Sequence, residues 1–111
     1  MTIKVHHTLL LTGAAGGLGQ ALRELLRQNC DVVRLSDRVA FGPAQAGEEV
    51  VIADLADAQA VHEMVRGVDA IVHFGGISVE SAFAPILQGN ILGMFNLYEA
   101  ARKHGVKRVV F

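Results

Sequence analysis

Gly13, Gly16 and Gly19 form a GxxGxxG spacing directly between an apolar run and a helical pattern. Such a turn lets the backbone approach a phosphate group, and the N-terminus of the following helix offers unpaired N–H groups and a partial positive charge. In dinucleotide-binding turns the three glycines, in order, permit the tight turn, admit the pyrophosphate and allow close packing of helix on sheet. We therefore predict a dinucleotide site here; the alternative is a glycine-rich turn without a ligand.

Asp37 ends the segment RLSD, 18 residues after Gly19. A carboxylate at this place accepts hydrogen bonds from the adenosine ribose hydroxyls and repels a 2′-phosphate, so it favours NAD over NADP. The next residue, Arg38, argues the other way, because a guanidinium pairs with that phosphate. We predict NAD as the cofactor, with a simple strand-end cap as the alternative role of Asp37.

Two further segments follow apolar runs and carry candidate cofactor-binding residues. Asp54 can accept a hydrogen bond from the adenine amino group, and Leu55 can pack near the adenine ring. Phe74, Gly75 and Gly76 follow the next run, where small residues let the backbone pass beside the cofactor. Strand ends line the ligand crevice of an open α/β sheet, so these positions are predicted to meet at one edge.

The elements that must position these residues follow from the hydrophobic pattern. Short runs that are apolar throughout alternate with helical stretches, which predicts a parallel sheet covered on both faces. Asn29, Gly67 and Gly105 are expected to end helices, and Asp57 to cap one. The expected strands cover residues 8–12, 31–36, 49–53, 70–74 and 106–111, and the expected helices cover 20–28, 57–66 and 83–103.

The predicted fold class is α/β, a Rossmann-like doubly wound parallel sheet that is truncated at its fifth strand. Residues 1–111 are expected to form one NAD-binding domain, the N-terminal part of a larger unit. A flavodoxin-like receiver is the alternative, but it requires acidic residues at the end of the first strand, where this chain has glycines.

The charge and composition of the chain limit the kinds of partner and the cellular location that we expect. The formal net charge is −1 and the sequence pI is about 6.5, so we expect neither nucleic acid nor an anionic membrane as a partner. We see no signal peptide and no apolar run long enough for a membrane span. The single cysteine, Cys30, fits a reducing cytoplasmic location.

The histidines form no metal-binding set, and His73, in a predicted strand, is expected to be a core histidine with its hydrogen bonds satisfied.

The motifs together resemble the extended short-chain dehydrogenase/reductase, or NAD-dependent epimerase/dehydratase, family. The resemblance lies in TGAAGGLG at 12–19, HFGG at 73–76 and NILGMFNLYEAARKHGVKRVVF at 90–111, together with Asp37 and Asp54-Leu55. Within that family, HFGGISVE and ILQGNILG are similar to uronate dehydrogenases. This resemblance implies an enzyme that uses NAD to oxidise C1 of a hexuronic acid, galacturonate or glucuronate, to an aldarolactone.

The resemblance also implies roles for individual residues. Ser78 would hydrogen-bond the sugar acid near the nicotinamide, although a loop cap is an equal alternative from spacing alone. Asn90 has two interpretations, a bond to the backbone of a neighbouring strand near the nicotinamide or support of a proton relay. The residues implied to contact NAD are Gly16, Gly17, Leu18, Asp37, Asp54, Leu55, Gly75 and Gly76.

No catalytic residue is predicted within this chain. The family's chemistry uses a serine after the fifth strand and a tyrosine with a lysine four residues later, and these are expected beyond Phe111. Tyr98 and Arg102 have the tyrosine–lysine spacing, but they lie on the helix before the fifth strand, and arginine remains charged. We therefore reject Tyr98 as a catalytic residue.

The helix over 83–103 is apolar on more than one face, so its surface must be covered by the remainder of the protein or by a second subunit. Members of the family that the motifs resemble often pair through helices in this region, which implies a homo-oligomer that forms through the 83–104 region. Two other functions remain open. One is a nucleotide-sugar epimerase or dehydratase, and the other is a regulator that binds NAD without turning it over. A stand-alone fragment of this length would expose apolar surface and is expected to aggregate.

Overall fold

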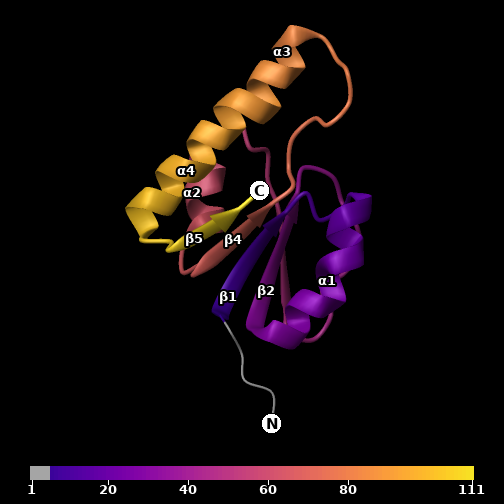
Figure 1. Ribbon diagram of the computed structural model, residues 1–111, viewed down its shortest axis with the longest axis vertical. Helices are drawn as coiled ribbons and strands as arrows, with labels where there is room; N and C mark the ends of the chain where they lie inside the picture. The colour runs from indigo at the N-terminus through magenta and orange to yellow at the C-terminus, as the bar shows by residue number, and fades with distance from the viewer. Residues whose placement is uncertain (1–5) are drawn as a thin grey trace.

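The computed structural model describes residues 6–111, which form five strands with helices in all but one of the connections between them (Figure 1). Every pair of neighbouring strands is parallel. In chain order the elements are β1 (His6–Thr12), α1 (Gly17–Asn29), β2 (Cys30–Asp37), β3 (Glu48–Ile52), α2 (Ala58–Val65), β4 (Ala70–His73), α3 (Phe83–Ile86), the π-helical segment η1 (Leu87–Leu92), α4 (Gly93–His104) and β5 (Arg108–Val110).

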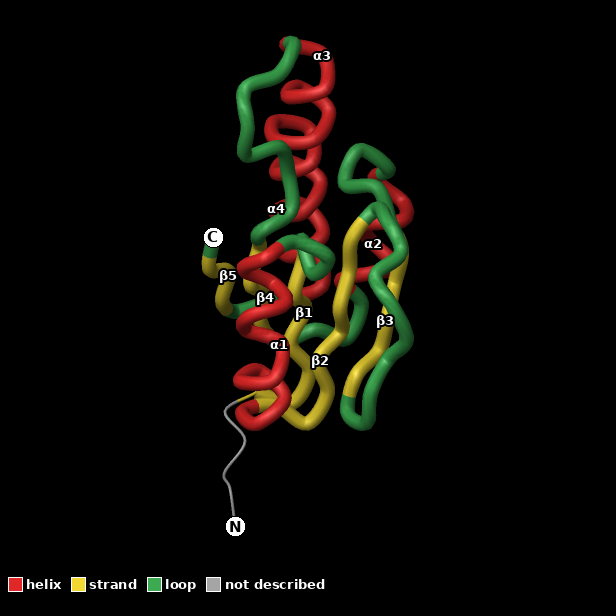
Figure 2. The backbone as a smooth tube through the Cα atoms, turned by 90° about the vertical axis from the view of Figure 1, so that its right-hand side faces the viewer, coloured by secondary structure: helices red, strands yellow, loops and turns green. Residues whose placement is uncertain are grey.

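The strand order is β3-β2-β1-β4-β5, which confirms the predicted Rossmann-like doubly wound sheet. From β1 the chain builds outward through β2 and β3, then returns to the other side of β1 with β4 and β5. The helix α1 covers one face of the sheet, and α2 and α4 cover the other (Figures 1 and 2). The direction of building reverses between β1 and β4, which is where open α/β sheets bind ligands at the carboxyl ends of their strands.

The sheet has a core on each face, because successive residues of a strand point to opposite sides. In β1, Leu10 packs with α2 and α4, whereas Leu9 and Leu11 pack in the core on the α1 face. Leu10 and Leu11 are both fully buried. This two-sided burial explains why the central strand is apolar without alternation.

Most predicted helix ends agree with the structure. Asp57 caps α2, since its Oδ1 accepts a hydrogen bond from the Ala60 N–H at 3.1 Å. Gly105 ends α4 in the left-handed conformation with φ +70°. The prediction that Asn29 caps α1 is wrong by one residue, because the cap is Cys30 and the Asn29 Nδ2 donates to the Leu25 carbonyl inside the last turn.

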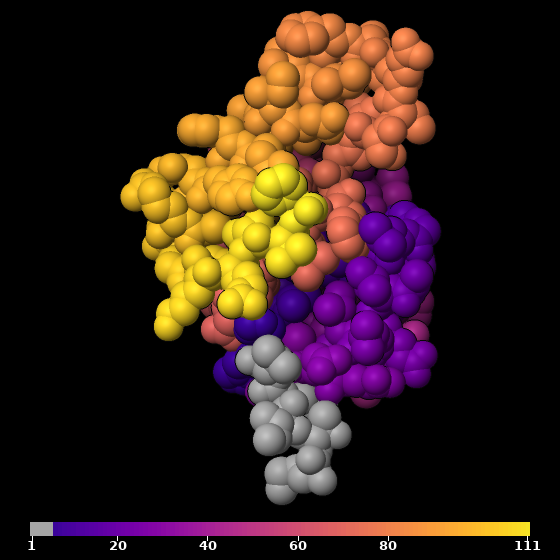
Figure 3. All heavy atoms as spheres, viewed as in Figure 1, coloured from indigo at the N-terminus to yellow at the C-terminus, as the bar shows by residue number. Residues whose placement is uncertain are grey.

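The long helix expected over 83–103 forms as a helical run from Phe83 to His104, but it is not α-helical throughout. Its middle, Leu87–Leu92, is π-helical, with a wider turn than the α3 and α4 segments on either side. Segments of this kind insert an extra residue into an α-helix and occur frequently at functional sites. The helix also extends past the carboxyl edge of the sheet, so that α3 and the loop before it form a projecting end of the molecule (Figures 1 and 3).

The loop after β2 is attached to α1 by an ion pair. The Glu48 side chain is enclosed, and its carboxylate accepts hydrogen bonds from the Arg23 guanidinium at 2.6 and 2.7 Å. The same guanidinium donates to the Pro43 carbonyl at 3.0 Å. The hydrogen bonds from Arg23 hold the pKa of Glu48 below its usual value. This pair fixes the loop that leaves Asp37.

Among the residues that the structure describes, no helix has both the length and the apolar character needed to cross a membrane.

Candidate cofactor-binding site

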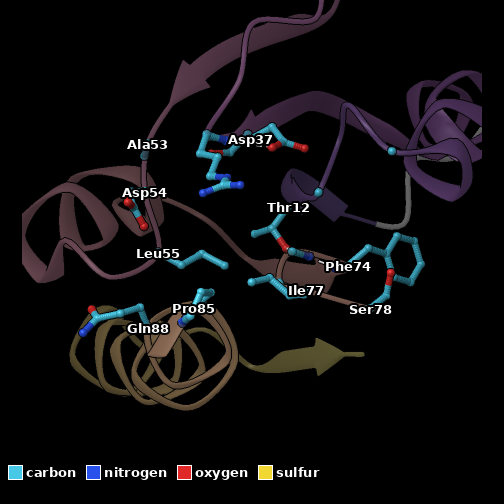
Figure 4. Close-up of a pocket in the computed structure, with 17 residues that line it drawn as sticks. Thr12, Asp37, Ala53, Asp54, Leu55, Phe74, Ile77, Ser78, Pro85 and Gln88 are labelled. Atoms are coloured by element: carbon cyan, nitrogen blue, oxygen red, sulfur yellow. Dashed lines mark hydrogen bonds between the residues drawn. The ribbon is translucent and has the colours of Figure 1, made fainter. Parts of the chain in front are cut away.

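A pocket of about 300 Å³ lies at the carboxyl edge of the sheet, where the ends of β1, β2, β3 and β4 face the helix that begins at α3 (Figure 4). Its walls come from segments up to 77 residues apart in the chain. The lining residues are Thr12, Gly13, Gly16, Ser36, Asp37, Arg38, Ala53, Asp54, Leu55, Phe74, Gly75, Gly76, Ile77, Ser78, Pro85, Gln88 and Gly89.

The structure brings together most of the residues predicted from the sequence. Those that line the pocket are Gly13, Gly16, Asp37, Asp54, Leu55, Phe74, Gly75, Gly76 and Ser78. Four predicted residues do not line it, namely Gly17, Leu18, Gly19 and Asn90. Gly17 and Leu18 open helix α1 at the edge of the pocket, and the Leu18 side chain is exposed.

The glycine turn is shaped by its contacts with β4. Gly13 has φ +70°, and a Cβ there would lie 2.6 Å from the carbonyl of Phe74, so no side chain fits. A Cβ on Gly19 would lie 2.6 Å from the Gly13 carbonyl oxygen, so Gly19 lets the helix pack on the turn itself. Gly16 is the N-cap of α1, which has neither a side-chain cap nor an acidic residue in its first turn. This helix N-terminus therefore retains the partial positive charge that suits a phosphate.

Asp37 connects β2 to the glycine turn. Its Oδ2 accepts a hydrogen bond from the Ala15 N–H at 3.0 Å, and its Oδ1 accepts one from the Arg38 N–H at 2.7 Å. The carboxylate remains half-buried in the pocket lining, so its oxygens have further lone pairs for a ligand hydroxyl. Arg38 also lines the pocket and is exposed.

The turn after β3, which contains Asp54 and Leu55, forms one wall of the pocket. The Asp54 Oδ1 accepts a hydrogen bond from the Ala56 N–H at 2.9 Å, and the Asp54 carbonyl accepts one from the Asp57 N–H at 3.0 Å. The Leu55 side chain extends from this turn into the pocket, above the helix that carries Pro85 and Gln88 (Figure 4). Ser78 lies at the other end of the pocket, beside Phe74, so Asp54 and Ser78 mark opposite ends.

Thr12 and His73 form a buried polar pair that sequence reasoning did not identify as part of the site. The Thr12 hydroxyl oxygen accepts hydrogen bonds from the N–H groups of Phe74 and Gly75, at 3.1 and 3.0 Å. Because these two bonds use both lone pairs of the hydroxyl oxygen, the Thr12 hydroxyl donates its proton to the His73 Nδ1, at 2.6 Å. Burial lowers the pKa of His73, which favours the neutral ring. His73 is thus the satisfied core histidine that the sequence predicts.

Asn90 holds the loop that follows β4. Its Oδ1 accepts a hydrogen bond from the Ile77 N–H at 2.6 Å, and its Nδ2 donates to the Ile77 carbonyl at 2.9 Å. Of the two interpretations, the structure shows the backbone contact, although the partner is a loop residue and not a strand residue. Asn90 lies in η1, and its contact fixes the segment that bears Gly76 and Ser78.

Tyr98 and Arg102 lie outside this pocket. The Arg102 guanidinium donates to the Glu99 carboxylate at 2.6 Å, and the Tyr98 ring packs edge-on against Phe111 with centroids 6.4 Å apart. In both contacts the partner is another residue of the C-terminal segment, 93–111. Among residues 6–111, no group of three or more His, Cys, Asp or Glu side chains is placed to hold a metal ion.

Residues 9–111 match the sequence pattern of the NAD dependent epimerase/dehydratase family. The chain belongs to this family. It is 59% identical to a uronate dehydrogenase of Pseudomonas putida, over 100% of the chain and 42% of that protein. It is 58% identical to a uronate dehydrogenase of Agrobacterium fabrum, over 93% of the chain and 39% of that protein. The resemblance deduced from the motifs is thereby confirmed.

The fold agrees with solved structures of the same family. A mutant uronate dehydrogenase from Agrobacterium tumefaciens, crystallised as a complex with NAD, superposes with a TM-score of 0.94 at 56% identity. The superposition covers 96% of the chain described here and 40% of the crystallised uronate dehydrogenase chain. The chain thus spans about two fifths of the length of the relatives it matches.

Proposed function

We propose that this chain forms the NAD-binding part of a dehydrogenase that oxidises C1 of a hexuronic acid, galacturonate or glucuronate, to an aldarolactone. The observation that carries the proposal is the pocket at the strand ends, whose walls contain the glycine turn, Asp37 and Ser78. The identity of 59% with a uronate dehydrogenase over the whole chain supports the choice of substrate class.

The pocket residues fit NAD in a consistent order. The turn from Gly13 to Gly19 and the uncapped start of α1, with Gly17 and Leu18, would hold the pyrophosphate. Asp37 would bind the adenosine ribose, and Asp54 with Leu55 would bind the adenine. The segment from Phe74 to Gly76 would run beside the cofactor, with Asn90 holding its continuation in place.

Ser78 would hydrogen-bond the sugar acid at the opposite end of the pocket from Asp54, as their places in Figure 4 allow. NAD supplies the hydride acceptor when bound. The groups that remove the proton from the C1 hydroxyl are expected in a part of the enzyme outside residues 1–111. Thr12 and His73 contribute by holding the backbone of Phe74 and Gly75 at the end of β4.

We further propose a cytoplasmic homo-oligomer. The helical region 83–104 exposes large apolar side chains, namely Phe83, Ile91, Phe95 and, in part, Tyr98. Exposed apolar surface of this kind marks association sites in soluble proteins. A second subunit packed there would remove it from water.

The proposal is tested with the complete gene product. Galacturonate, glucuronate and a panel of nucleotide sugars are supplied with NAD, and NADH formation is followed by absorbance. Oxidation of a uronate with release of the lactone supports the proposal. Turnover of nucleotide sugars alone assigns the chain to an epimerase or dehydratase. Tight NAD binding without any turnover identifies a regulator, and both results contradict the proposed activity.

A further inference from the structure

Asn96 is a buried polar residue of α4 for which the proposed binding scheme has no role. Asn96 is only 5% exposed, and its Nδ2 donates a hydrogen bond of 2.8 Å to the carbonyl oxygen of Leu55. The two residues are 41 positions apart in the chain. A buried amide is unfavourable unless it is hydrogen-bonded, so this contact fixes the turn after β3 to α4.

Leu55 is enclosed by two glycines as well as by this bond. A Cβ on Gly93, in α4, would lie 2.9 Å from the Leu55 Cβ, and a Cβ on Gly75 would lie 2.8 Å from the Leu55 Cδ1. Both distances are too short for real side chains, so Leu55 occupies space that the two glycines leave. The side chain is therefore held between α4 and the end of β4, where it reaches the pocket (Figure 4).

The other hydrogen bonds of the turn do not set its distance from the rest of the pocket. The bonds from Ala56 and Asp57 to Asp54 lie within the turn and only close it on itself. The bond from the Ala53 N–H to the Asp37 carbonyl ends the pairing of β3 with β2. The contact with α4 is thus the connection that places Leu55 opposite Gly75.

We propose that Asn96 is a positioning residue for the adenine half of the dinucleotide. It acts through the Leu55 carbonyl and does not touch the cofactor. The inference rests on the proposed function, because that function assigns the turn at Asp54 and Leu55 to the adenine. Gly93 also helps to place Leu55, because it leaves room for the Leu55 side chain against α4. A methyl group at Gly93 and loss of the amide at Asn96 should therefore both displace the turn.

The test uses the complete gene product with Asn96→Leu and, separately, Gly93→Ala. Binding of ADP-ribose, which carries the adenine but no nicotinamide, is measured by calorimetry. KM for the uronate is measured at saturating NAD. We expect each variant to raise the Kd for ADP-ribose about tenfold, while KM for the uronate stays within about twofold. Gly93→Ala keeps the inference testable should Asn96→Leu fail to fold.

Val33→Ala is the matched control, because Val33 is fully buried in the core on the other face of the sheet. It should lower the melting temperature and leave the Kd for ADP-ribose unchanged. ADP-ribose affinity within twofold of the wild type in both variants overturns the role of Asn96 but not the proposed function. A wild-type protein that binds no ADP-ribose overturns both. A protein that binds ADP-ribose and shows the expected shifts, but oxidises no uronate, contradicts the proposed activity alone.

Discussion

Asp37 illustrates how one side chain combines a structural and a recognition task. Its carboxylate holds the Ala15 N–H of the glycine turn, and it also places a negative charge in the pocket lining. An amide oxygen can take over the first task but not the second. The two tasks can therefore be separated by a single substitution.

We predict that Asp37→Asn in the complete gene product keeps the fold and weakens the preference for NAD over NADP about tenfold, roughly 1.4 kcal/mol. The reason is that the variant keeps an acceptor for the Ala15 N–H while it no longer repels a 2′-phosphate. Dissociation constants for both dinucleotides check this. An unchanged preference would show that Asp37 acts only as a strand-end cap. Equal or tighter binding of NADP by the wild type would contradict the NAD assignment.

The buried hydroxyl of Thr12 is expected to matter for stability. Thr12→Val conserves shape but leaves the N–H groups of Phe74 and Gly75, and the His73 ring, without this partner. We expect a loss of about 1–3 kcal/mol in the free energy of unfolding, measured by urea denaturation. Thr12→Ser retains the hydroxyl and is the control. Equal destabilisation by both variants would assign the effect to the lost methyl group.

His73 makes stability depend on pH. Its pKa is lowered in the folded protein by burial, so the unfolded chain binds a proton that the folded chain does not. Stability should therefore be unaffected by this group above pH 6.5, the ordinary histidine value, and should fall as the pH decreases below it. His73→Asn, which cannot titrate, should flatten the slope of unfolding free energy against pH below this value. A slope identical to that of the wild type would contradict the assignment.

At the scale of elements, two glycines with the same backbone conformation have different surroundings. Gly13 and Gly105 both have φ +70°, but a Cβ on Gly105 would meet nothing within 4 Å, whereas one on Gly13 would collide with β4. We predict that Gly105→Ala costs about 1 kcal/mol, the penalty of the conformation alone. Gly13→Ala should cost clearly more and abolish dinucleotide binding. Comparison of the melting temperatures tests the difference, and equal losses would contradict it.

The sequence allowed prediction of the elements whose signals are local. Strands buried on both faces, the Asp57 cap and the Gly105 helix end are all recognisable from a few consecutive residues. The π-helical segment at Leu87–Leu92 was not predicted, because its wider turn carries no distinct periodicity. The apolar run predicts the first strand at 8–12, and pairing with β2 extends this strand to His6.

The candidate site was predictable where a residue follows a buried strand, as for Asp37, Asp54 and Phe74. It was not predictable where the signal is a contact between distant segments. Gln88 reaches the pocket because the helix projects beyond the sheet, and Thr12 matters because β4 lies beside it. Asn96 was missed for the same reason, since its partner Leu55 is 41 residues away.

At the scale of the whole molecule, the exposed apolar face of the long helix makes a prediction about assembly. In the proposed oligomer, Phe95 is covered by a second subunit, although it is 63% exposed in this chain. Phe95→Glu in the complete gene product should shift the sedimentation profile toward monomer, because a charge would be buried at the contact. Ala101→Ser, a polar change at a buried position of the same helix, is the control. An unchanged oligomer would place the contact elsewhere.

The attachment of two loops to one late helix has a consequence for how the protein is made. Asn90 holds the loop after β4, and Asn96 holds the turn after β3. Both follow strands β1 to β4 in the chain, so a ribosome must release this helix before the pocket can take its final shape. A bound nucleotide can therefore stabilise the pocket of the nascent protein only once residues near 96 have emerged.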